Sequence, residues 1–253
     1  MSQLFERTWP IESPKAAVAL VHGLAEHTGR YEHVARALNS AGYHVIARDL
    51  RGHGQSPGFP GDVGGELQPV IDDVAQLCLD AASVHPTAFV LAHSMGTLLT
   101  IPAIAALPAD TLSGAVLSGT AIVPGAAVME SLMTSAGVPP ETVSRDPDVV
   151  RAYAADDLVF ADRIPMDLTM MAAEAIQRVT DAVPLVSIPV LLVHGSQDVI
   201  ADPSGSAQVH AQLVVTDKTL TIYDGLYHEV LNEPEKDRVI SDVIAWLDSH
   251  CVV

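Results

Sequence analysis

The stretch FVLAHSMGTLL, Phe89 to Leu99, changes character at its centre. It begins with the apolar run Phe89–Ala92, which predicts a buried strand, and continues from Met95 with a spacing typical of a helix. Only His93 and Ser94 remain to turn the chain between the two elements. So short a connection predicts one strand-turn-helix unit of an alternating β/α chain, with Ser94 on the turn.

The same alternation extends from this stretch in both directions. The expected strands are the apolar runs 4–9, 16–21, 44–48, 88–91, 114–117, 190–193 and 219–223. Helical periodicity covers 31–41, 67–84, 95–106, 205–213 and 235–249. Strands that alternate with helices predict an α/β protein with a mostly parallel central sheet flanked by helices on both faces.

Residues 121–187 interrupt this alternation, since they contain several prolines, a charged stretch SRDPDVVRAYAADD (144–157) and no clear strand. We expect them to form a helical cap, or lid, over a core formed by residues 1–120 and 188–253. Five of the seven methionines lie in this segment, namely Met129, Met133, Met166, Met170 and Met171. Flexible thioethers suit an adaptable apolar binding surface, and the alternative is that these side chains fill the core beneath the cap.

Composition excludes several classes of partner. The 253 residues carry 31 Asp and Glu against 13 Lys and Arg, a formal net charge of −18. Nucleic acid and anionic membranes are therefore excluded as partners, whereas transient contact with a neutral lipid surface stays open. Two distant cysteines indicate no disulfide framework, and the N-terminal stretch lacks the apolar run of a signal peptide, so we expect a cytoplasmic protein. The oligomeric state is left open.

Ser94 has the local setting of a nucleophile. In a nucleophile elbow, small residues two positions before and after the serine let strand and helix approach each other, and the strained turn exposes the hydroxyl. Ala92 and Gly96 occupy those positions, although the common pattern G-x-S-x-G has glycine at both. We expect alanine to adjust the elbow slightly without abolishing it. The alternative is an ordinary serine between a buried strand and a helix.

A serine nucleophile needs a base and an orienting acid, and both have candidates in the chain order Ser, Asp, His. His228 lies in a loop after the last expected strand, where the alternative is a buried structural histidine. Asp198 closely follows the expected strand 190–193, and catalytic groups gather at the carboxyl ends of parallel strands. It is therefore preferred to its rivals Asp202 and Asp224.

An oxyanion hole needs two backbone amides that point at the developing negative charge. The amide of Met95, directly after the serine, is the first candidate. The amide of Leu24 is the second, because His22 and Gly23 turn the chain after the expected strand 16–21. The alternative for His22 and Gly23 is an ordinary turn.

Six segments together resemble the monoacylglycerol lipase branch of the α/β-hydrolase superfamily, also described as the serine aminopeptidase S33 or hydrolase 4 group. They are HGLAEHTGRYEHVARAL (22–38), DLRGHGQSPG (49–58), AHSMG (92–96), VSRDPDVVRAYAADDLV (143–159), VHGSQDVIADP (193–203) and YDGLYHEVLNE (223–233). They occur in the family's order and extend almost from end to end of the chain. Jointly they are far more specific than the serine motif.

The resemblance implies the α/β-hydrolase fold with a lid, and a catalytic triad of Ser94, Asp198 and His228. It places the amides of Leu24 and Met95 in the oxyanion hole. Candidate substrate contacts are Glu26, Arg30, Met129, Met133 and Met170. For Glu26 and Arg30 the alternative is a salt bridge that braces the start of the first helix.

The activity that the resemblance implies is hydrolysis of a monoacylglycerol or another neutral single-chain ester through an acyl-enzyme. No cofactor and no metal are needed for this chemistry. Lysophospholipase, general carboxylesterase and proline iminopeptidase-like activities would use the same triad. A binding protein on the same scaffold, without turnover, is the alternative from another class.

Overall fold

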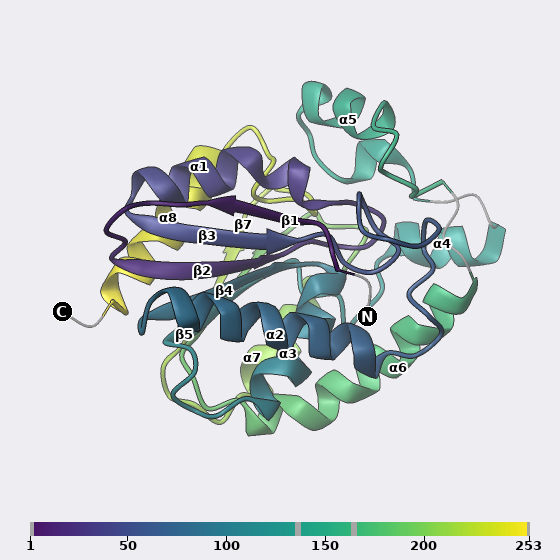
Figure 1. Ribbon diagram of the computed structural model, residues 1–253. Coiled ribbons are helices and arrows are strands. Elements are labelled where there is room, and N and C mark those ends of the chain that lie inside the picture. Colours follow the sequence, from purple (N-terminus) through teal and green to yellow (C-terminus); the bar gives the residue numbers. More distant parts are fainter. Residues whose placement is uncertain (1–2, 135–137, 163–165, 252–253) are drawn as a thin grey trace.

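A seven-stranded sheet forms the centre of the protein (Figure 1). The computed structural model describes residues 3–134, 138–162 and 166–251. The strands are β1 (Glu6–Trp9), β2 (Ala16–Val21), β3 (Tyr43–Arg48), β4 (Ala88–His93), β5 (Gly114–Ser118), β6 (Val190–Gly195) and β7 (Lys218–Tyr223). Their order is β1-β3-β2-β4-β5-β6-β7; β1 runs antiparallel to β3, and the other neighbouring pairs are parallel. The predicted mostly parallel sheet is confirmed.

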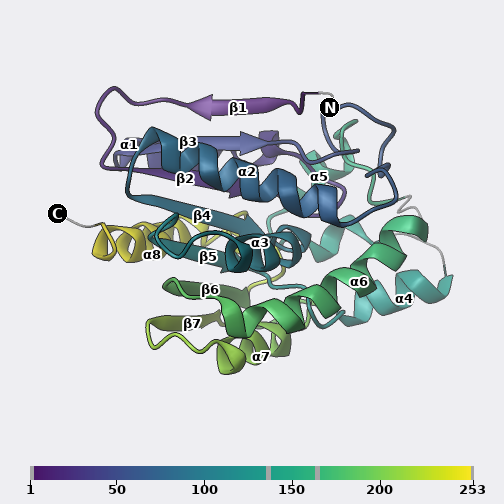
Figure 2. The same cartoon turned by 60° about the horizontal axis from the view of Figure 1, so that its bottom comes forward.

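Helices cover both faces of the sheet, as the turned view shows (Figure 2). One face packs against α1 (Glu32–Ser40) and α8 (Lys236–Ser249). The other face packs against α2 (Gln68–Val84), α3 (Met95–Ala106) and α7 (Ser204–Gln212), and α6 (Met166–Ala182) lies on α3. Alternate residues of β2 enter the two apolar layers, Val18 on the side of α1 and Ala19 on the side of α2. Double coverage explains why every residue of β2 and β4 is buried, why β2 is apolar throughout and why β4 is apolar from Ala88 to Ala92.

The strand ends differ from the sequence-based boundaries where the site is built. Strand β4 extends to His93 and strand β6 to Gly195, two residues beyond the expected ends in each case. Ladder pairing continues there, because His93 is opposite Ser118 and Gly195 is opposite Tyr223. His93 and His194 hid the continuation, since apolar patterning stops before the hydrogen-bonded ladder does.

The connection between β5 and β6 is helical in its described parts. It contains α4 (Ala126–Thr134), α5 (Pro147–Ala154) and α6, with short 3₁₀ turns at 140–142 and 183–185. In Figure 1, α5 lies at the upper right, and α4 and α6 lie below it. The α5 part is bonded to two loops of the core, because Phe160 donates its N–H to Ala25 and Glu229 donates its N–H to Val143. Helix α6 packs against α3.

No helix within the described ranges is long and apolar enough to span a bilayer.

Candidate active site

Ser94 occupies a strained turn between β4 and α3. Its backbone has φ 52° and ψ −123°, a conformation with positive φ that is costly for a residue with a side chain. The Ser94 N–H donates to the Ser118 carbonyl at 2.8 Å, which ties the turn to β5. A Cβ at Gly96 would lie 2.6 Å from the His22 carbonyl oxygen, so only glycine permits this approach of helix and strand. The strained elbow is therefore formed with Ala92 in the position where glycine is common.

Three side chains from separate parts of the chain meet at this turn. The Ser94 hydroxyl donates to Nε2 of His228 at 2.8 Å, and Nδ1–H of His228 donates to Oδ2 of Asp198 at 2.6 Å. All three residues are buried. The rival acids are engaged elsewhere, since Asp202 accepts from the Ser204 N–H and Asp224 accepts from the Ser196 hydroxyl. Asp198 is thus the acid that the fold places on His228.

The electrostatics of the pair Asp198 and His228 favour the charged forms of both groups. Burial would raise the pKa of Asp198, but the charge of His228 and hydrogen bonds from His194 and His228 outweigh it and hold the pKa far below its ordinary value. Burial also opposes protonation of His228, and the Asp198 carboxylate more than compensates, so the pKa of His228 is raised. An imidazole of raised basicity, in contact with a hydroxyl, has the properties of a general base.

The loop after β2 lies directly against the nucleophile. A Cβ on Gly23 would be 3.1 Å from the Ser94 Cβ, and Ala25 has a positive φ of 60°. The loop is held on both sides, because Leu50 donates its N–H to His22 at 2.9 Å and Gly23 donates its N–H to Glu26 at 2.6 Å.

The amides of Leu24 and Met95 make no hydrogen bond to another protein group within the described residues. Leu24 follows Gly23, whose Cβ position would lie 3.1 Å from the Ser94 Cβ, and Met95 directly follows Ser94 in the chain. Their part in an oxyanion hole stays a prediction.

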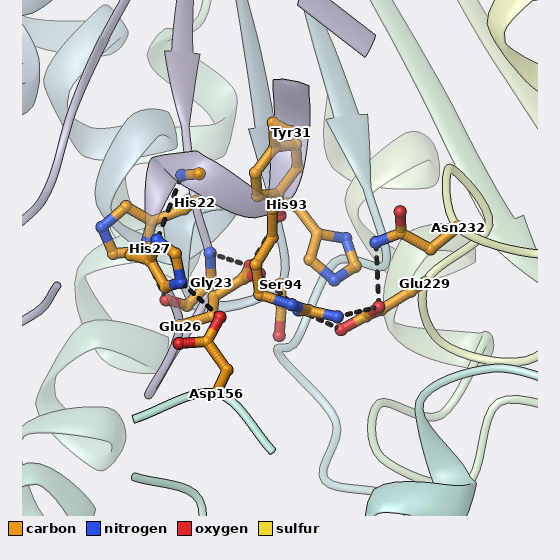
Figure 3. Close-up of polar contacts among 12 residues, drawn as sticks. His22, Gly23, Glu26, His27, Tyr31, His93, Ser94, Asp156, Glu229 and Asn232 are labelled. Atoms are coloured by element: carbon orange, nitrogen blue, oxygen red, sulfur yellow. Dashed lines mark hydrogen bonds and ion pairs between the residues drawn. The ribbon is translucent and has the colours of Figure 1, made fainter. Parts of the chain in front are cut away.

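Glu26 and Arg30 form a buried ionic network with Glu229. Figure 3 shows Glu26 and Glu229 of this network with their surroundings. Glu26 accepts from Gly23, from the Tyr31 hydroxyl at 2.6 Å and from the Arg30 guanidinium at 2.6 Å. Arg30 also makes two bonds to Glu229, of 2.6 and 2.7 Å. The bracing salt bridge considered from the sequence is therefore present, and it connects the loop of Leu24 to the loop of His228. Contact of Glu26 or Arg30 with substrate stays a prediction.

The charges of this network hold one another in place. Burial would lower the pKa of Arg30 and raise that of Glu26, but the attraction between opposite charges reverses both shifts. The segment around α5 closes over the network, since the Tyr153 ring lies 4.5 Å from the Arg30 guanidinium carbon and Asp156 accepts from Nε2–H of His27 at 2.8 Å. The network therefore joins three segments around the site.

The predicted methionine contacts are only partly described. Met129 on α4 is 48% exposed. Met133 and Met170 belong to α4 and α6, but their side chains lie outside the described residues, as does that of Met166. Met171 packs against the apolar core below the helices, which is the alternative considered for these residues.

Three residues near the site were not singled out from the sequence. His194 donates a second hydrogen bond to Asp198, Glu229 pairs with Arg30, and the His93 ring lies 4.6 Å from the His228 ring between centroids. His93 and His194 lie at the carboxyl ends of β4 and β6, and Glu229 directly follows His228. Those positions were the only available signal, because the partners of Glu229 and His93 are distant in sequence and the contact of His194 with Asp198 depends on the turn after β6.

The fold and the Ser–His–Asp geometry together define an α/β-hydrolase. Residues 12–235 match the family described as "Serine aminopeptidase, S33", also called Hydrolase_4, and the chain belongs to this family. The resemblance inferred from the motifs is thus confirmed.

Curated relatives and solved structures agree with this assignment. A monoacylglycerol lipase of Mycolicibacterium smegmatis is 37% identical over 95% of this chain and 91% of its own length. The human monoglyceride lipase is 30% identical over 98% of this chain and 87% of its own length. The crystal structure of Paleococcus ferrophilus monoacylglycerol lipase superposes with a TM-score of 0.85 at 31% identity, covering 98% of this chain and 99% of that one.

Proposed function

We propose that this chain is a serine ester hydrolase that acts on monoacylglycerols, or similar neutral single-chain carboxylic esters, through an acyl-enzyme. The observation that carries the proposal is the buried hydrogen-bonded chain from Ser94 through His228 to Asp198. Relatives that are named monoacylglycerol or monoglyceride lipases support the substrate class.

Acylation begins when the Ser94 oxygen attacks the ester carbonyl carbon and its proton passes to Nε2 of His228. Asp198 holds the Nδ1–H tautomer and stabilises the imidazolium that forms. The amides of Leu24 and Met95 donate to the carbonyl oxygen as it becomes negative. The tetrahedral intermediate then collapses, and His228 returns the proton to the departing alcohol.

Deacylation repeats the same steps with water. A water molecule attacks the acyl-enzyme while His228 accepts its proton, and collapse of the second intermediate releases the carboxylic acid and restores the Ser94 hydroxyl. No cofactor or metal takes part in either half. Both halves use one base and one oxyanion site, so a single geometry serves the whole cycle.

The segment 121–187 is assigned in this proposal as the cap, over a core of 1–120 and 188–253. Met129, Met133 and Met170 would contact the acyl chain, and Glu26 and Arg30 would lie near the polar end of the substrate. The net charge of −18 disfavours anionic esters through long-range repulsion. A cytoplasmic location with transient contact to neutral lipid surfaces belongs to the same proposal.

The test compares initial rates of wild type and Ser94→Ala on monoacylglycerols and p-nitrophenyl esters. The substitution should reduce kcat/KM by about three orders of magnitude or more. Ser83→Ala, which changes an exposed serine of α2 far from the site, is the matched control and should retain full activity. Near wild-type rates in Ser94→Ala would overturn the mechanism.

Two further arms separate the alternatives. Lysophospholipids and a proline p-nitroanilide in the same panel distinguish lysophospholipase and iminopeptidase activities from the proposed one. A fluorophosphonate should label wild type stoichiometrically at Ser94, and a folded protein that resists labelling would favour a binding role.

A further inference from the structure

The Asp198 carboxylate receives a second histidine besides His228. His194 lies on β6, four residues before Asp198, and its side chain is fully buried. Its Nε2 is 2.9 Å from Oδ2 of Asp198 and 3.0 Å from the Ala201 carbonyl oxygen, while its Nδ1 is 2.7 Å from the Ser206 hydroxyl. His194 is thus hydrogen-bonded through both ring nitrogens, to a loop and to helix α7.

The partners of His194 determine which nitrogen carries its hydrogen. Nε2 faces a carboxylate oxygen and a carbonyl oxygen, which can only accept, so Nε2 bears the hydrogen. The Ser206 hydroxyl then donates to the unprotonated Nδ1. Ser206 is itself fully buried on α7, so Nδ1 is bonded to a group that water does not reach. His194 accordingly donates to Asp198 through Nε2–H.

Four donors hold the carboxylate in one orientation. Oδ1 of Asp198 accepts the backbone N–H groups of Ile200 at 2.8 Å and Ala201 at 2.9 Å. Oδ2 is shared between His194 and His228. Rotation of the carboxylate would break bonds at both oxygens, and an unsatisfied buried acceptor is costly. The donor from His194 is the one side-chain bond, apart from that of His228, in this set.

We propose that His194 is a positioning residue of this hydrolase, which fixes Oδ2 of Asp198 toward His228 and, by sharing that oxygen, limits the strength of the hydrogen bond between Asp198 and His228. The inference rests on the proposed function, because His194 acts only through Asp198 and His228. Ser206 takes part by holding the His194 ring through Nδ1.

The other charged groups around both histidines are constant in the variants below. His228 is faced by Asp198, by Glu229 of its own loop, by Glu26 of the loop after β2 and by the His93 ring at the end of β4. His194 is faced by Asp198, and by Asp202 in the loop before α7. A change in pH dependence that appears in one His194 variant and not in its counterpart therefore originates at the bond to Asp198.

The experiment compares two amides that each keep one half of the histidine. In His194→Gln the side-chain amide reaches the position of Nε2 and keeps a donor to Asp198, whereas in His194→Asn it reaches only the position of Nδ1 and keeps the contact with Ser206. Both replacements are neutral amides, and asparagine is smaller than glutamine by one methylene. Their comparison tests the bond to Asp198, and the active-site titration described below accounts for losses that come from packing alone.

Rates on a soluble p-nitrophenyl ester are measured against pH. His194→Asn should lower kcat about tenfold with little change in KM, because Asp198 loses one of its four donors. With one donor fewer, Asp198 attracts the His228 proton more strongly, so the rising limb of kcat/KM should move to higher pH by about half a unit to one unit. His194→Gln should keep both quantities close to wild type.

A third variant and a spectroscopic readout keep the inference testable if His194→Asn folds poorly. Ser206→Ala leaves Asp198 untouched and should move the limb in the same direction by less, since the His194 ring loses its bond to helix α7. The proton NMR signal of Nδ1–H of His228 should shift in His194→Asn and Ser206→Ala and stay in place in His194→Gln.

Identical pH profiles for the asparagine and glutamine variants, with an unmoved limb in Ser206→Ala, would overturn the inference. Fluorophosphonate titration counts the active sites in each preparation, so a merely structural loss is recognised as fewer sites with unchanged kcat and pH profile per site. Failure of the proposed function is recognised separately, as activity that survives Ser94→Ala.

Discussion

Replacement of Arg30 by methionine tests the ionic network that joins the two loops of the site. Arg30 makes three charge-assisted hydrogen bonds, one to Glu26 at 2.6 Å and two to Glu229 at 2.6 and 2.7 Å. The three side chains are at most 9% exposed. Arg30→Met therefore leaves two buried carboxylates without their cation.

The magnitude follows from the donors that remain. Removal of one partner from a buried ion pair costs about 3–5 kcal/mol of the free energy of unfolding. Glu26 still accepts from Gly23 and Tyr31, and Glu229 still accepts from Asn232, so we expect the lower end, about 3 kcal/mol. For a chain of this length, the corresponding loss in Tm is about 6–12 °C.

The loss of unfolding free energy in Arg30→Met should depend on pH. In wild type the pKa of Glu26 is lowered against burial by Arg30, so this group stabilises the fold above its unfolded pKa and loses that contribution as the pH falls. Without Arg30, burial dominates and raises the pKa of Glu26, so the variant loses stability as the pH rises. The difference between variant and wild type should therefore be smaller at about pH 5 than at about pH 8.

Urea unfolding followed by circular dichroism measures these free energies. Arg36→Met is the matched control, because Arg36 also pairs with a glutamate four residues away at 2.6 Å but is 73% exposed, and it should cost less than about 1 kcal/mol. The double variant Arg30→Met/Glu229→Gln should recover about 1 kcal/mol or more by removal of one stranded charge. A loss in Arg30→Met no larger than in Arg36→Met, with the same pH dependence as wild type, would refute the reasoning.

The remaining predictions concern the elbow and the base. Because Asp198 raises the pKa of His228, the rising limb of kcat/KM should lie above the ordinary histidine value in a pH series of initial rates, and a limb below it would contradict the geometry. Asp198→Asn should lower kcat by about four orders of magnitude in the same assay while fluorescence shows an intact fold; retention of most of the rate would exclude it as the orienting acid. Gly96→Ala should strongly reduce both activity and Tm, since its Cβ would lie 2.6 Å from the His22 carbonyl oxygen. Ala92→Gly should keep an activity within a few-fold of wild type. Equally small effects of the two substitutions on activity and Tm would show that the elbow tolerates either.

Local sequence patterns were enough to predict most strands of the sheet and the turn at Ser94. The strands around Ser94 could be predicted because parallel strands covered on both faces are mostly apolar. The tight turn at Ser94 could be predicted because so few residues separate the strand from the helix. The predicted strand ends were wrong where polar residues continue a ladder, as at His93 and His194. Hydrogen bonding between strands is indifferent to side-chain polarity, so patterning does not report it.

The sequence by itself determined the order of the elements, the elbow at Ser94 and the chain order of serine, acid and histidine. Only the tertiary structure decided that Asp198, and not Asp202 or Asp224, meets His228, that Arg30 joins Glu26 to Glu229, and that His194 shares the acid. The physical reason is that these contacts join residues brought together by the parallel sheet and its loops. A hydrogen bond of less than 3 Å depends on backbone geometry that no local pattern of residues encodes.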